Sequence, residues 1–356
     1  KKLVGMLATA TLLTMALAGN VQAAEIRSVG PDGEAAVDAS TIELTDDQIA
    51  QIKEGGYTAA ICLHYGGNDW STSQQKGLED TFGELGIEIV AVTDANFSAE
   101  TQVSNIETVM AKKPDILVSI PTDATATADA YKQAAAAGIK IVFMDQRANG
   151  LEAGKDYVSV VSADNYGNGY ASGTVLGDAL GGKGKVAMVY YDANFAPTNQ
   201  RDEGFRDAMK NYPDIEIVTE QGFTDESGCA EQGDAILTQF PNIDGIYASW
   251  DVPMEGVLSA VRAAGMEGKV TLACNDLGNN VAREIASGNI AGGGAQMPYD
   301  QGVAEAKLAA LALLGEETPS YVAVPAETVT HENVLEAYTD VYHVETPDWL
   351  KEAYVE

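Results

Sequence analysis

Cysteines and basic residues are both scarce in this chain of 356 residues, and each shortage excludes certain partners or binding sites. The chain has 21 lysines and arginines against 53 acidic residues, a net charge of −32. Such acidity argues against nucleic acid and anionic membrane surfaces as partners. Cys62, Cys229 and Cys274 are too few for a disulfide framework, and no Cys-x-x-Cys pair is present to bind zinc. At most one disulfide can form, and we expect buried thiols at Cys62 and Cys274, which lie in apolar runs.

Long apolar runs are absent after the first two dozen residues, so no later segment is expected to span a membrane. At the start, two lysines precede the apolar run Leu3–Ala18, and small or apolar residues precede a cleavage site after Ala23. This layout is typical of a secretory signal peptide, and the run is short for a span of ~20 residues. No cysteine follows it, so a lipid anchor is not expected. We predict that residues 1–23 are removed and that the mature protein resides in the periplasm.

Short apolar runs alternate with amphipathic stretches from Tyr57 onward. Ten runs are predicted strands: Thr58–His64, Ile87–Thr93, Asp115–Ile120, Ile139–Met144, Tyr157–Val161, Lys185–Tyr191, Ile215–Thr219, Gly245–Trp250, Val270–Cys274 and Ile290–Gln296. Near-continuous apolar strands alternating with helices indicate parallel sheets covered on both faces. Ten strands exceed what one doubly wound domain usually holds. The sequence therefore predicts an α/β fold of two Rossmann-like lobes.

The segments outside this pattern are expected to be accessory. Residues 24–55 are predicted to form an N-terminal extension that is rich in glycine and aspartate before a short acidic helix at Asp46–Lys53. The tail from Thr318 predicts two short extended pieces and a helix around Trp349.

Polar and aromatic residues gather where several predicted strands end. In open parallel sheets, ligands bind beyond the carboxyl ends of the strands. Carboxylates, amides and guanidinium groups bind adjacent hydroxyls in bidentate fashion, and an indole can pack against the apolar face of a sugar ring. We therefore predict a site for a neutral sugar from the following residues: His64, Asn68, Trp70, Asp145, Gln146, Arg147, Arg201, Trp250, Asp251, Asp276 and Gln296.

A structural alternative exists for the three aspartates of this set. Asp145, Asp251 and Asp276 could each cap the helix that follows, and Asp251 stands two residues before Pro253, a normal helix opening. A single tryptophan is likewise more often a core residue than a ligand platform. The convergence of many such residues at strand ends favours the binding site.

Three expectations about individual side chains follow from this site. Trp70 and Trp250 should line the cleft and stack on the ligand, so that Trp250→Ala weakens binding with little loss of folding. Asp276 should lie at an open cleft, where its removal leaves no buried partner unpaired.

A series of motifs carries a family resemblance through their order and spacing. They are Leu85-Gly86, Asp115–Pro121, Ala137-Gly138-Ile139, Ser162–Gly167, Gly182–Lys185, Arg201–Phe205 and Pro241–Gly245, followed by Asp276, Gln296 and Pro298. On these motifs, the stretch from Tyr57 to about Pro325 resembles the ribose/galactose/xylose-type sugar-binding proteins of ABC importers. This is the periplasmic binding protein class I, which also supplies the ligand domains of lactose-repressor-type regulators.

The resemblance implies a first lobe of residues 57–163 plus 297–325, and a second lobe of residues 164–296 plus the tail 326–356. Three crossings near Ala163, Gln296 and Pro325 would form the hinge, and ligand would close the lobes.

The resemblance also implies roles for six residues. Asn68 matches the family's first-loop amide, Trp70 an aromatic platform and Asp145 a strand-end carboxylate. Arg201 matches the arginine of the R-x-x-G-F motif, and Asp276 and Gln296 match the carboxylate and amide of the second lobe and hinge.

Departures from the family pattern leave the identity of the sugar open. Asp145-Gln146 stands where the family commonly has Asp-Arg, with Arg147 displaced by one position. Trp250-Asp251 stands where the family has Asn-Asp, and His64 and Ser71 replace commoner choices. We expect a small sugar or polyol as ligand, and a non-sugar solute with the same transport role is the alternative. Membrane permease subunits are the expected partners, a chemoreceptor is a further candidate, and the protein is expected to be a monomer.

Nucleotide and redox enzymes fit the sequence poorly. Gly177–Lys183 imitates the opening of a phosphate loop, but Gly184 stands where Ser or Thr must bind magnesium. The segment also lies between a helix and the next strand, the reverse of the required order. Gly167-Asn168-Gly169-Tyr170 lacks the third glycine of a dinucleotide site.

Other function classes are also disfavoured. A glycosidase would need paired catalytic carboxylates, and no residue can be assigned as its general acid. A transcription regulator would need a basic DNA-binding segment ahead of Tyr57, where the chain is acidic. A calcium loop from Asp164 would place Tyr166 and Val175 at ligand positions that they cannot fill. We therefore expect no enzyme activity, no cofactor and no metal.

Overall fold

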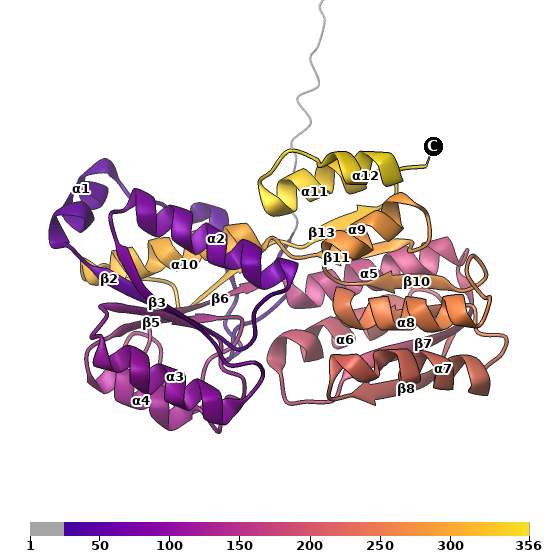
Figure 1. The fold of residues 1–356 in the computed structure, drawn as a ribbon, viewed down its shortest axis with the longest axis horizontal. Coiled ribbons are helices and arrows are strands. Elements are labelled where there is room, and N and C mark those ends of the chain that lie inside the picture. Colours follow the sequence, from indigo (N-terminus) through magenta and orange to yellow (C-terminus); the bar gives the residue numbers. More distant parts are fainter. Residues whose placement is uncertain (1–24, 356) are drawn as a thin grey trace, which may run out of the picture.

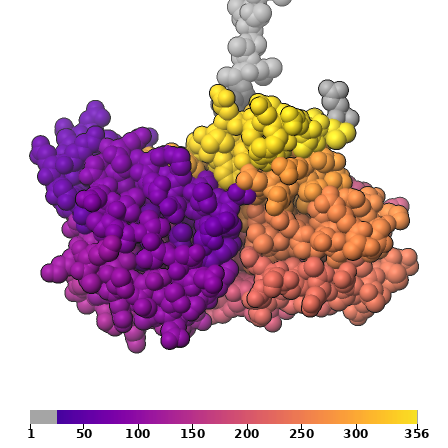
Figure 2. All heavy atoms as spheres, viewed as in Figure 1, coloured from indigo at the N-terminus to yellow at the C-terminus, as the bar shows by residue number. Residues whose placement is uncertain are grey.

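The computed structural model describes residues 25–355, so the predicted signal peptide at residues 1–23 lies outside the described part of the chain. Two α/β lobes lie side by side, each a twisted sheet with helices on both faces (Figure 1). The space-filling view shows the two lobes in contact along the face that it presents (Figure 2). The predicted fold class is confirmed.

The first lobe is built on a parallel sheet of seven strands in the order β1-β12-β6-β5-β4-β2-β3. Its strands are β1 (Val37–Asp38), β2 (Thr58–Leu63), β3 (Glu88–Asp94), β4 (Ile116–Ser119), β5 (Lys140–Met144), β6 (Ser159–Ala163) and β12 (Tyr321–Val324). Its helices are α1 (Asp46–Gly55), α2 (Asp69–Glu84), α3 (Ala99–Ala111), α4 (Ala128–Ala136) and α10 (Pro298–Leu313), with a 3-10 turn at Ala39–Thr41.

The second lobe has a sheet of six strands in the order β13-β11-β10-β9-β7-β8. Its strands are β7 (Lys183–Tyr191), β8 (Asp214–Phe223), β9 (Gly245–Ala248), β10 (Thr271–Cys274), β11 (Gly292–Ala295) and β13 (Glu327–Thr330). Its helices are α5 (Asn165–Ala179), α6 (Ala196–Met209), α7 (Cys229–Gln239), α8 (Asp251–Ala263), α9 (Asn279–Ala286), α11 (Val334–Tyr342) and α12 (Asp348–Ala353), with a 3-10 turn at Glu226–Gly228. Among the described strand pairs, only β11 and β13 run antiparallel.

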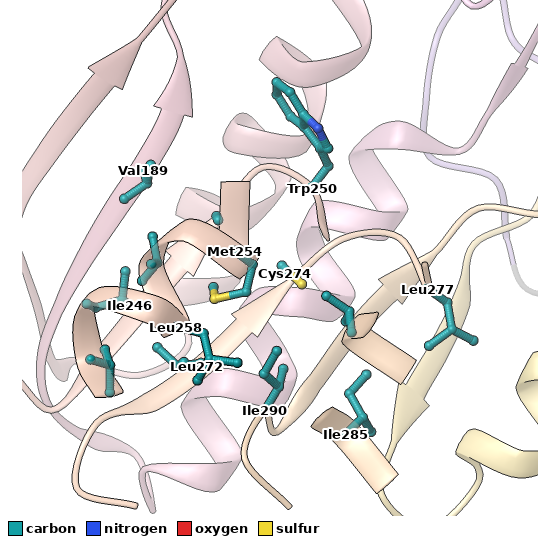
Figure 3. Close-up of a cluster of buried hydrophobic side chains, with 14 of the residues drawn as sticks. Val189, Ile246, Trp250, Met254, Leu258, Leu272, Cys274, Leu277, Ile285 and Ile290 are labelled. Carbon is teal, nitrogen blue, oxygen red and sulfur yellow. The ribbon is translucent and has the colours of Figure 1, made fainter. Parts of the chain in front are cut away.

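The buried strands show why this sequence forms covered sheets. In β4, Ile116 and Val118 face the cluster under α2 and α10, whereas Leu117 faces the cluster under α3 and α4. Because side chains alternate between faces, a strand covered on both sides must be apolar at every position. The second lobe repeats this arrangement, with α5 and α6 on one face and α7, α8 and α9 on the other. Figure 3 shows the latter cluster, with Trp250 at one edge of it.

The chain crosses between the sheets three times, from β6 to α5, from β11 to α10 and from β12 to β13. Each of the ten predicted runs contains one of the strands β2 to β11 or overlaps it. The two extended pieces of the tail, β12 and β13, belong to different sheets, and α11 was not predicted.

The N-terminal extension is part of the fold and contacts both lobes. Its strand β1 pairs with β12 at the edge of the first sheet. Before it, the backbone N–H groups of Arg27 and Ser28 donate to the carboxylate of Asp164 at 3.0 and 2.8 Å, directly at the first crossing. The Arg27 guanidinium lies 4.1 Å from the ring centre of Tyr170 in α5. The extension therefore joins the hinge region to the second lobe.

All three cysteines are buried and unpaired. In the part of the chain that the structure describes, no helix combines the length and the apolar character needed to cross a membrane.

Candidate ligand-binding cleft

A small cavity of about 50 Å³ lies between the lobes, at the carboxyl ends of strands from both sheets. Its walls come from both lobes: His64, Tyr65, Asn68, Trp70, Phe97, Ile120 and Asp145 from the first, and Tyr191, Phe195, Pro197, Thr198, Arg201, Trp250, Asp276 and Gln296 from the second lobe and the crossing that follows β11. This is where parallel sheets bind ligands, because their loops and helix starts converge there.

An ion pair forms the charged centre of the cavity. Arg201 Nη1 donates to Asp276 Oδ2 at 3.1 Å and to the Ser249 carbonyl at 3.2 Å, while its Nε donates to Asn165 Oδ1 at 2.8 Å. Gln296 Nε2 donates to the other oxygen of Asp276 at 2.8 Å. Burial alone lowers the pKa of Arg201, but the charges of Asp276 and Asp145 outweigh burial and raise it. The guanidinium is thus fixed in place before any ligand arrives.

Close packing of two helices sets the position of Arg201. A Cβ atom on Gly169 of α5 would lie 1.8 Å from the Arg201 carbonyl, and one on Gly204 of α6 would lie 2.1 Å from the Tyr166 carbonyl. Only glycine permits this approach. The R-x-x-G-F motif therefore carries both the cation and the contact that holds its helix against α5.

Asp145 and Asp276 occupy equivalent places in the two lobes. Asp145 directly follows β5, and Asp276 follows β10 after one intervening residue, Asn275. Each has a left-handed backbone, with φ of 54° and 69°. The Asp145 amide donates to Val161 O of β6 at 2.7 Å, and the Asp276 amide donates to Gly294 O of β11 at 2.8 Å. Aspartate tolerates this conformation better than most residues. The turn directs both carboxylates toward the cleft.

The side-chain hydrogen-bond partners of Asp145 are neutral. Its Oδ1 accepts hydrogen bonds from Ser162 Oγ at 2.9 Å and from Gln301 Nε2 at 3.4 Å. Burial raises the pKa of this carboxyl group, and the charge of Arg201 opposes the rise.

Aromatic rings form the rest of the wall. His64 stacks on Phe195 across the cleft, with ring centres 5.6 Å apart, and meets Trp70 edge-on at 5.8 Å. Tyr191 of the second lobe lies 5.6 Å from Trp250. Burial lowers the pKa of His64 to about 3, so this ring is neutral at physiological pH. The aromatic wall is thus uncharged.

The structure places eight of the predicted site residues on this cavity: His64, Asn68, Trp70, Asp145, Arg201, Trp250, Asp276 and Gln296. Their contacts with ligand remain predictions. Asn68 is already engaged, because its Oδ1 caps α2 by accepting from the Ser71 amide at 2.8 Å and its Nδ2 donates to the Tyr65 hydroxyl.

The other three predicted residues lie beside the cavity. Gln146 accepts from the Ala196 amide at 3.2 Å and so links the two lobes. Arg147 forms an ion pair with Asp32 of the extension at 2.7 Å. Both line a neighbouring hollow that Asp145 shares. Asp251 lies in a small space behind Asp276, and burial, followed by the charge of Asp276, raises its pKa well above the usual range.

The structure shows whether the three aspartates cap helices, which was the alternative to a role in the cleft. Neither Asp145 nor Asp276 caps a helix, and the N-cap of α9 is Gly278. Asp251 is the first residue of α8 and accepts from the adjacent Val252 amide at 2.9 Å. The expectation that Asp276 lacks a buried partner is wrong, because Arg201 is only 4% exposed.

The expected tolerance of Trp250→Ala is contradicted as well. Trp250 is 6% exposed and packs with Tyr191 and Phe223, and its Nε1 donates to Glu226 Oε1 at 2.8 Å. Truncating such a residue costs about 3–5 kcal/mol of stability. This tryptophan serves the core and the cleft together.

Several lining residues were missed by the sequence reasoning. Tyr65 directly follows one predicted strand and Tyr191 ends another, so the strand-end rule could have found both. Phe97, Phe195 and Thr198 lie in connecting segments or a helix start, where no pattern marks them.

Two covered sheets, three crossings and a cleft between strand ends define a two-lobed ligand-binding protein. Residues 59–317 match the family described as periplasmic binding protein domain, and the chain belongs to this family.

Named relatives agree with this assignment. The chain is 24% identical to the ribose import binding protein of Salmonella typhimurium over 76% of this chain and 90% of that protein. It is 29% identical to the D-ribose/D-allose-binding protein of Pseudomonas aeruginosa, over 74% and 83% of the two chains.

Solved structures of ABC transporter solute-binding proteins show the same fold. The protein from Actinobacillus succinogenes with bound D-allose aligns with a TM-score of 0.72 and 29% identity, over 78% of this chain and 99% of that one. The protein from Agrobacterium vitis with bound α-D-tagatopyranose aligns with a TM-score of 0.74 and 26% identity, over 82% of this chain and 100% of that one.

Proposed function

We propose that the protein is the solute-binding component of an ABC importer and captures a small neutral sugar or polyol in the cleft between its lobes. The observation that carries this proposal is the group of Arg201, Asp276, Gln296 and Asp145, which offers a cation, an amide and two carboxylates within one cavity. Adjacent hydroxyls both donate and accept, so they suit such a mixed set. Relatives named for ribose and allose support the same ligand class.

The charge of the cleft supports a neutral ligand. Asp145 and Asp276 face a single cation, Arg201, which Asp276 already engages. A ligand carboxylate or phosphate would meet a site with no spare positive charge.

Binding would work through the hinge. A ligand that contacts both lobes stabilises their closed arrangement, and the closed form is what the membrane permease subunits would recognise. We propose that the protein acts in the periplasm as a monomer, makes or breaks no bond in its ligand, and has a chemoreceptor as a further candidate partner.

A thermal-shift screen against pentoses, hexoses, deoxysugars and polyols tests the ligand class. A ligand at about 100 times its Kd should stabilise the folded protein by about 2.7 kcal/mol. Shifts with amino acids, nucleosides or peptides alone would contradict the sugar ligand and leave the transport role standing. If the protein hydrolysed aryl glycosides, the proposal that it binds its ligand without catalysing a reaction would be contradicted.

A further inference from the structure

A carboxylate of the first lobe reaches across to the start of a helix in the second lobe. Asp69 is the first residue of α2, and Asn279 is the first residue of α9. Asp69 Oδ2 accepts from the Asn279 backbone N–H at 2.7 Å, and its Oδ1 accepts from Asn279 Nδ2 at 2.8 Å. The end of α2 that carries Asp69 lies where the two lobes meet (Figure 1). Both hydrogen bonds therefore join the lobes directly.

The start of α9 has no side-chain cap from its own N-cap residue. That residue is Gly278, and a Cβ atom placed on it would overlap Asp251 Oδ2, so a larger residue does not fit there. The free N–H groups at a helix start need an acceptor, either a side chain or water. Asp69 supplies one from the other lobe, and its negative charge suits the positive end of the helix.

A residue of the C-terminal tail fixes the orientation of Asn279. The Tyr338 hydroxyl of α11 donates to Asn279 Oδ1 at 2.5 Å, and its buried ring packs against Tyr342. An ionised carboxylate can only accept, so the Asn279 amide directs its Nδ2 to Asp69 and its Oδ1 to the hydroxyl. The tail thus takes part in the contact between the lobes.

The tail also touches the first lobe directly. His343 is the C-cap of α11, and its Nε2 lies 3.1 Å from an Asp300 carboxylate oxygen. Its ring packs on Tyr299, with ring centres 4.4 Å apart. Tyr299 and Asp300 belong to α10 of the first lobe. Because α11 also packs on α9, it bridges the two sides of the cleft.

The contact between Asp69 and Asn279 lies beside the cavity. Asn68 and Trp70, the sequence neighbours of Asp69, line the cavity, whereas Asp69 and Asn279 do not. Opening at the hinge moves the lobes apart, and a hydrogen bond is lost once its atoms are more than about 3.5 Å apart. The bonds of Asp69 to Asn279 therefore stabilise the closed arrangement without touching the ligand.

We propose that Asp69 is a latch that holds the cleft closed by binding the start of α9, and that it raises the affinity for every ligand by the same factor. This inference rests on the hinge closure in the proposed function. When only a fraction of the protein is closed, the apparent affinity falls in proportion to that fraction. A residue that stabilises the closed form therefore strengthens binding from a distance. Tyr338 is a positioning residue of the latch, because it acts through Asn279.

The variant Asp69→Ala tests the latch by two measurements. Calorimetry should show Kd rising by one common factor, about 2 to 10, for each sugar that binds, because a net hydrogen bond contributes that much. Small-angle X-ray scattering should show a larger radius of gyration for the ligand-free variant than for the ligand-free wild type, and equal radii at saturation. If the ligand-free wild type is mainly open, the change falls on Kd, and if it is mainly closed, the change falls on the radius.

Glu100→Ala is the matched control, because Glu100 is exposed in the first turn of another helix of the first lobe, α3. It should leave Kd and the radius unchanged. If neither quantity changes in Asp69→Ala, the latch is overturned. A changed ratio of affinities between two sugars would also overturn it, because Asp69 would then act on the ligand itself. If no sugar binds the wild type, the proposed function is contradicted, and an unchanged radius in Asp69→Ala then overturns the latch separately.

The variant Tyr338→Phe tests the support from the tail, since it keeps the ring and removes the hydroxyl that orients Asn279. Its effect should have the same direction as that of Asp69→Ala and be smaller, because the Asn279 backbone N–H still donates to Asp69. Tyr212→Phe is the control, since that hydroxyl donates to Asp178 within the second lobe at 2.7 Å. No effect in Tyr338→Phe, or an equal effect in Tyr212→Phe, would contradict the positioning role of Tyr338.

Discussion

The two lobes hold equivalent carboxylates in different surroundings. Asp145 and Asp276 both lie just beyond the end of a strand, both have a left-handed backbone, and both donate their backbone amide to a neighbouring strand. Asp276, however, forms an ion pair with Arg201, whereas Asp145 is bonded to the neutral groups Ser162 and Gln301. The backbone therefore fixes where each carboxylate lies, and residues from distant helices decide its electrostatics.

Removal of Arg201 should have the largest effect, because it would erase the difference between the lobes. Arg201→Met leaves Asp276 buried without its cation, and breaking such a pair costs about 3–5 kcal/mol. Urea unfolding should show this loss, and calorimetry should detect no sugar binding. Arg206→Met is the control on the same helix. Its ion pair with Glu220 is more than one-third exposed on both sides, so the loss should stay below about 1 kcal/mol. Equal losses of stability in the two variants would contradict the conclusion that the buried ion pair of Arg201 with Asp276 stabilises the fold more than an exposed pair does.

The next effect compares the two carboxylates directly. Asp276→Asn removes a charge-assisted contact with ligand and weakens the hold on Arg201, so affinity should fall about 10- to 150-fold. Asp145→Asn keeps an acceptor for Ser162, and affinity should fall less than about 10-fold. Calorimetry on both variants with one sugar measures the difference. Equal losses of affinity in the two variants would show that the ion pair with Arg201 does not make Asp276 more important for binding than Asp145.

A third test uses pH, because the second lobe buries another carboxyl group beside Arg201. Asp202 accepts from Ser249 Oγ at 2.6 Å and from Tyr247 OH at 3.3 Å, and burial raises its pKa to about 6. A raised pKa favours the protonated folded state, so stability is lost as pH rises between the unfolded value near 4 and about 6.

The variant Asp202→Asn removes this titration. The free energy of unfolding of the variant minus that of the wild type should increase by about 2 kcal/mol as the pH is raised from about 4.5 to about 7.5. Asp207→Asn on the same helix is the control. A hydrogen bond from Lys210, followed by one from Tyr166, lowers the pKa of Asp207, so this carboxyl group titrates below about pH 4 and the variant should show no change relative to the wild type between about pH 4.5 and about pH 7.5. If the difference in free energy of unfolding between Asp202→Asn and the wild type did not change with pH, the raised pKa of Asp202 would be contradicted.

The smallest expected effect concerns the neutral partner of Asp145. Ser162→Ala removes one hydrogen bond that a neutral hydroxyl donates to that carboxylate, and affinity should fall by up to about 10-fold. Ser159→Ala on the same strand is the matched control, because Ser159 is equally buried and bonds to the Val160 carbonyl. Calorimetry should show no change in the control. A loss in Ser159→Ala as large as in Ser162→Ala would mean that strand β6, rather than the Asp145 contact, determines the affinity.

The sequence predicted the strands because burial on both faces requires continuous apolar runs, as in β4 and β5. It also predicted most of the cavity residues that directly follow strands, since parallel strands end at one edge. The partner of Asp276 could not be predicted, because Arg201 comes from a helix that only close glycine packing brings near.

The turn at Asp145 explains why its two neighbours lie beside the cavity between the lobes and do not line it. The left-handed residue redirects the chain, so Gln146 and Arg147 point into the adjoining hollow. Phe97 and Phe195 lie off the strands, where no periodicity exists to place a side chain. The pairing of β1 with β12 joins residues far apart in sequence over two positions, which leaves no local pattern to detect.

The position of β12 has a consequence for the synthesis of the protein. This strand lies inside the first sheet, between β1 and β6, yet it is made after the whole second sheet except β13. A growing chain therefore cannot complete its first lobe until residue 324 has been made. Such non-local pairing slows folding, so the nascent chain keeps an open sheet edge through most of its translation.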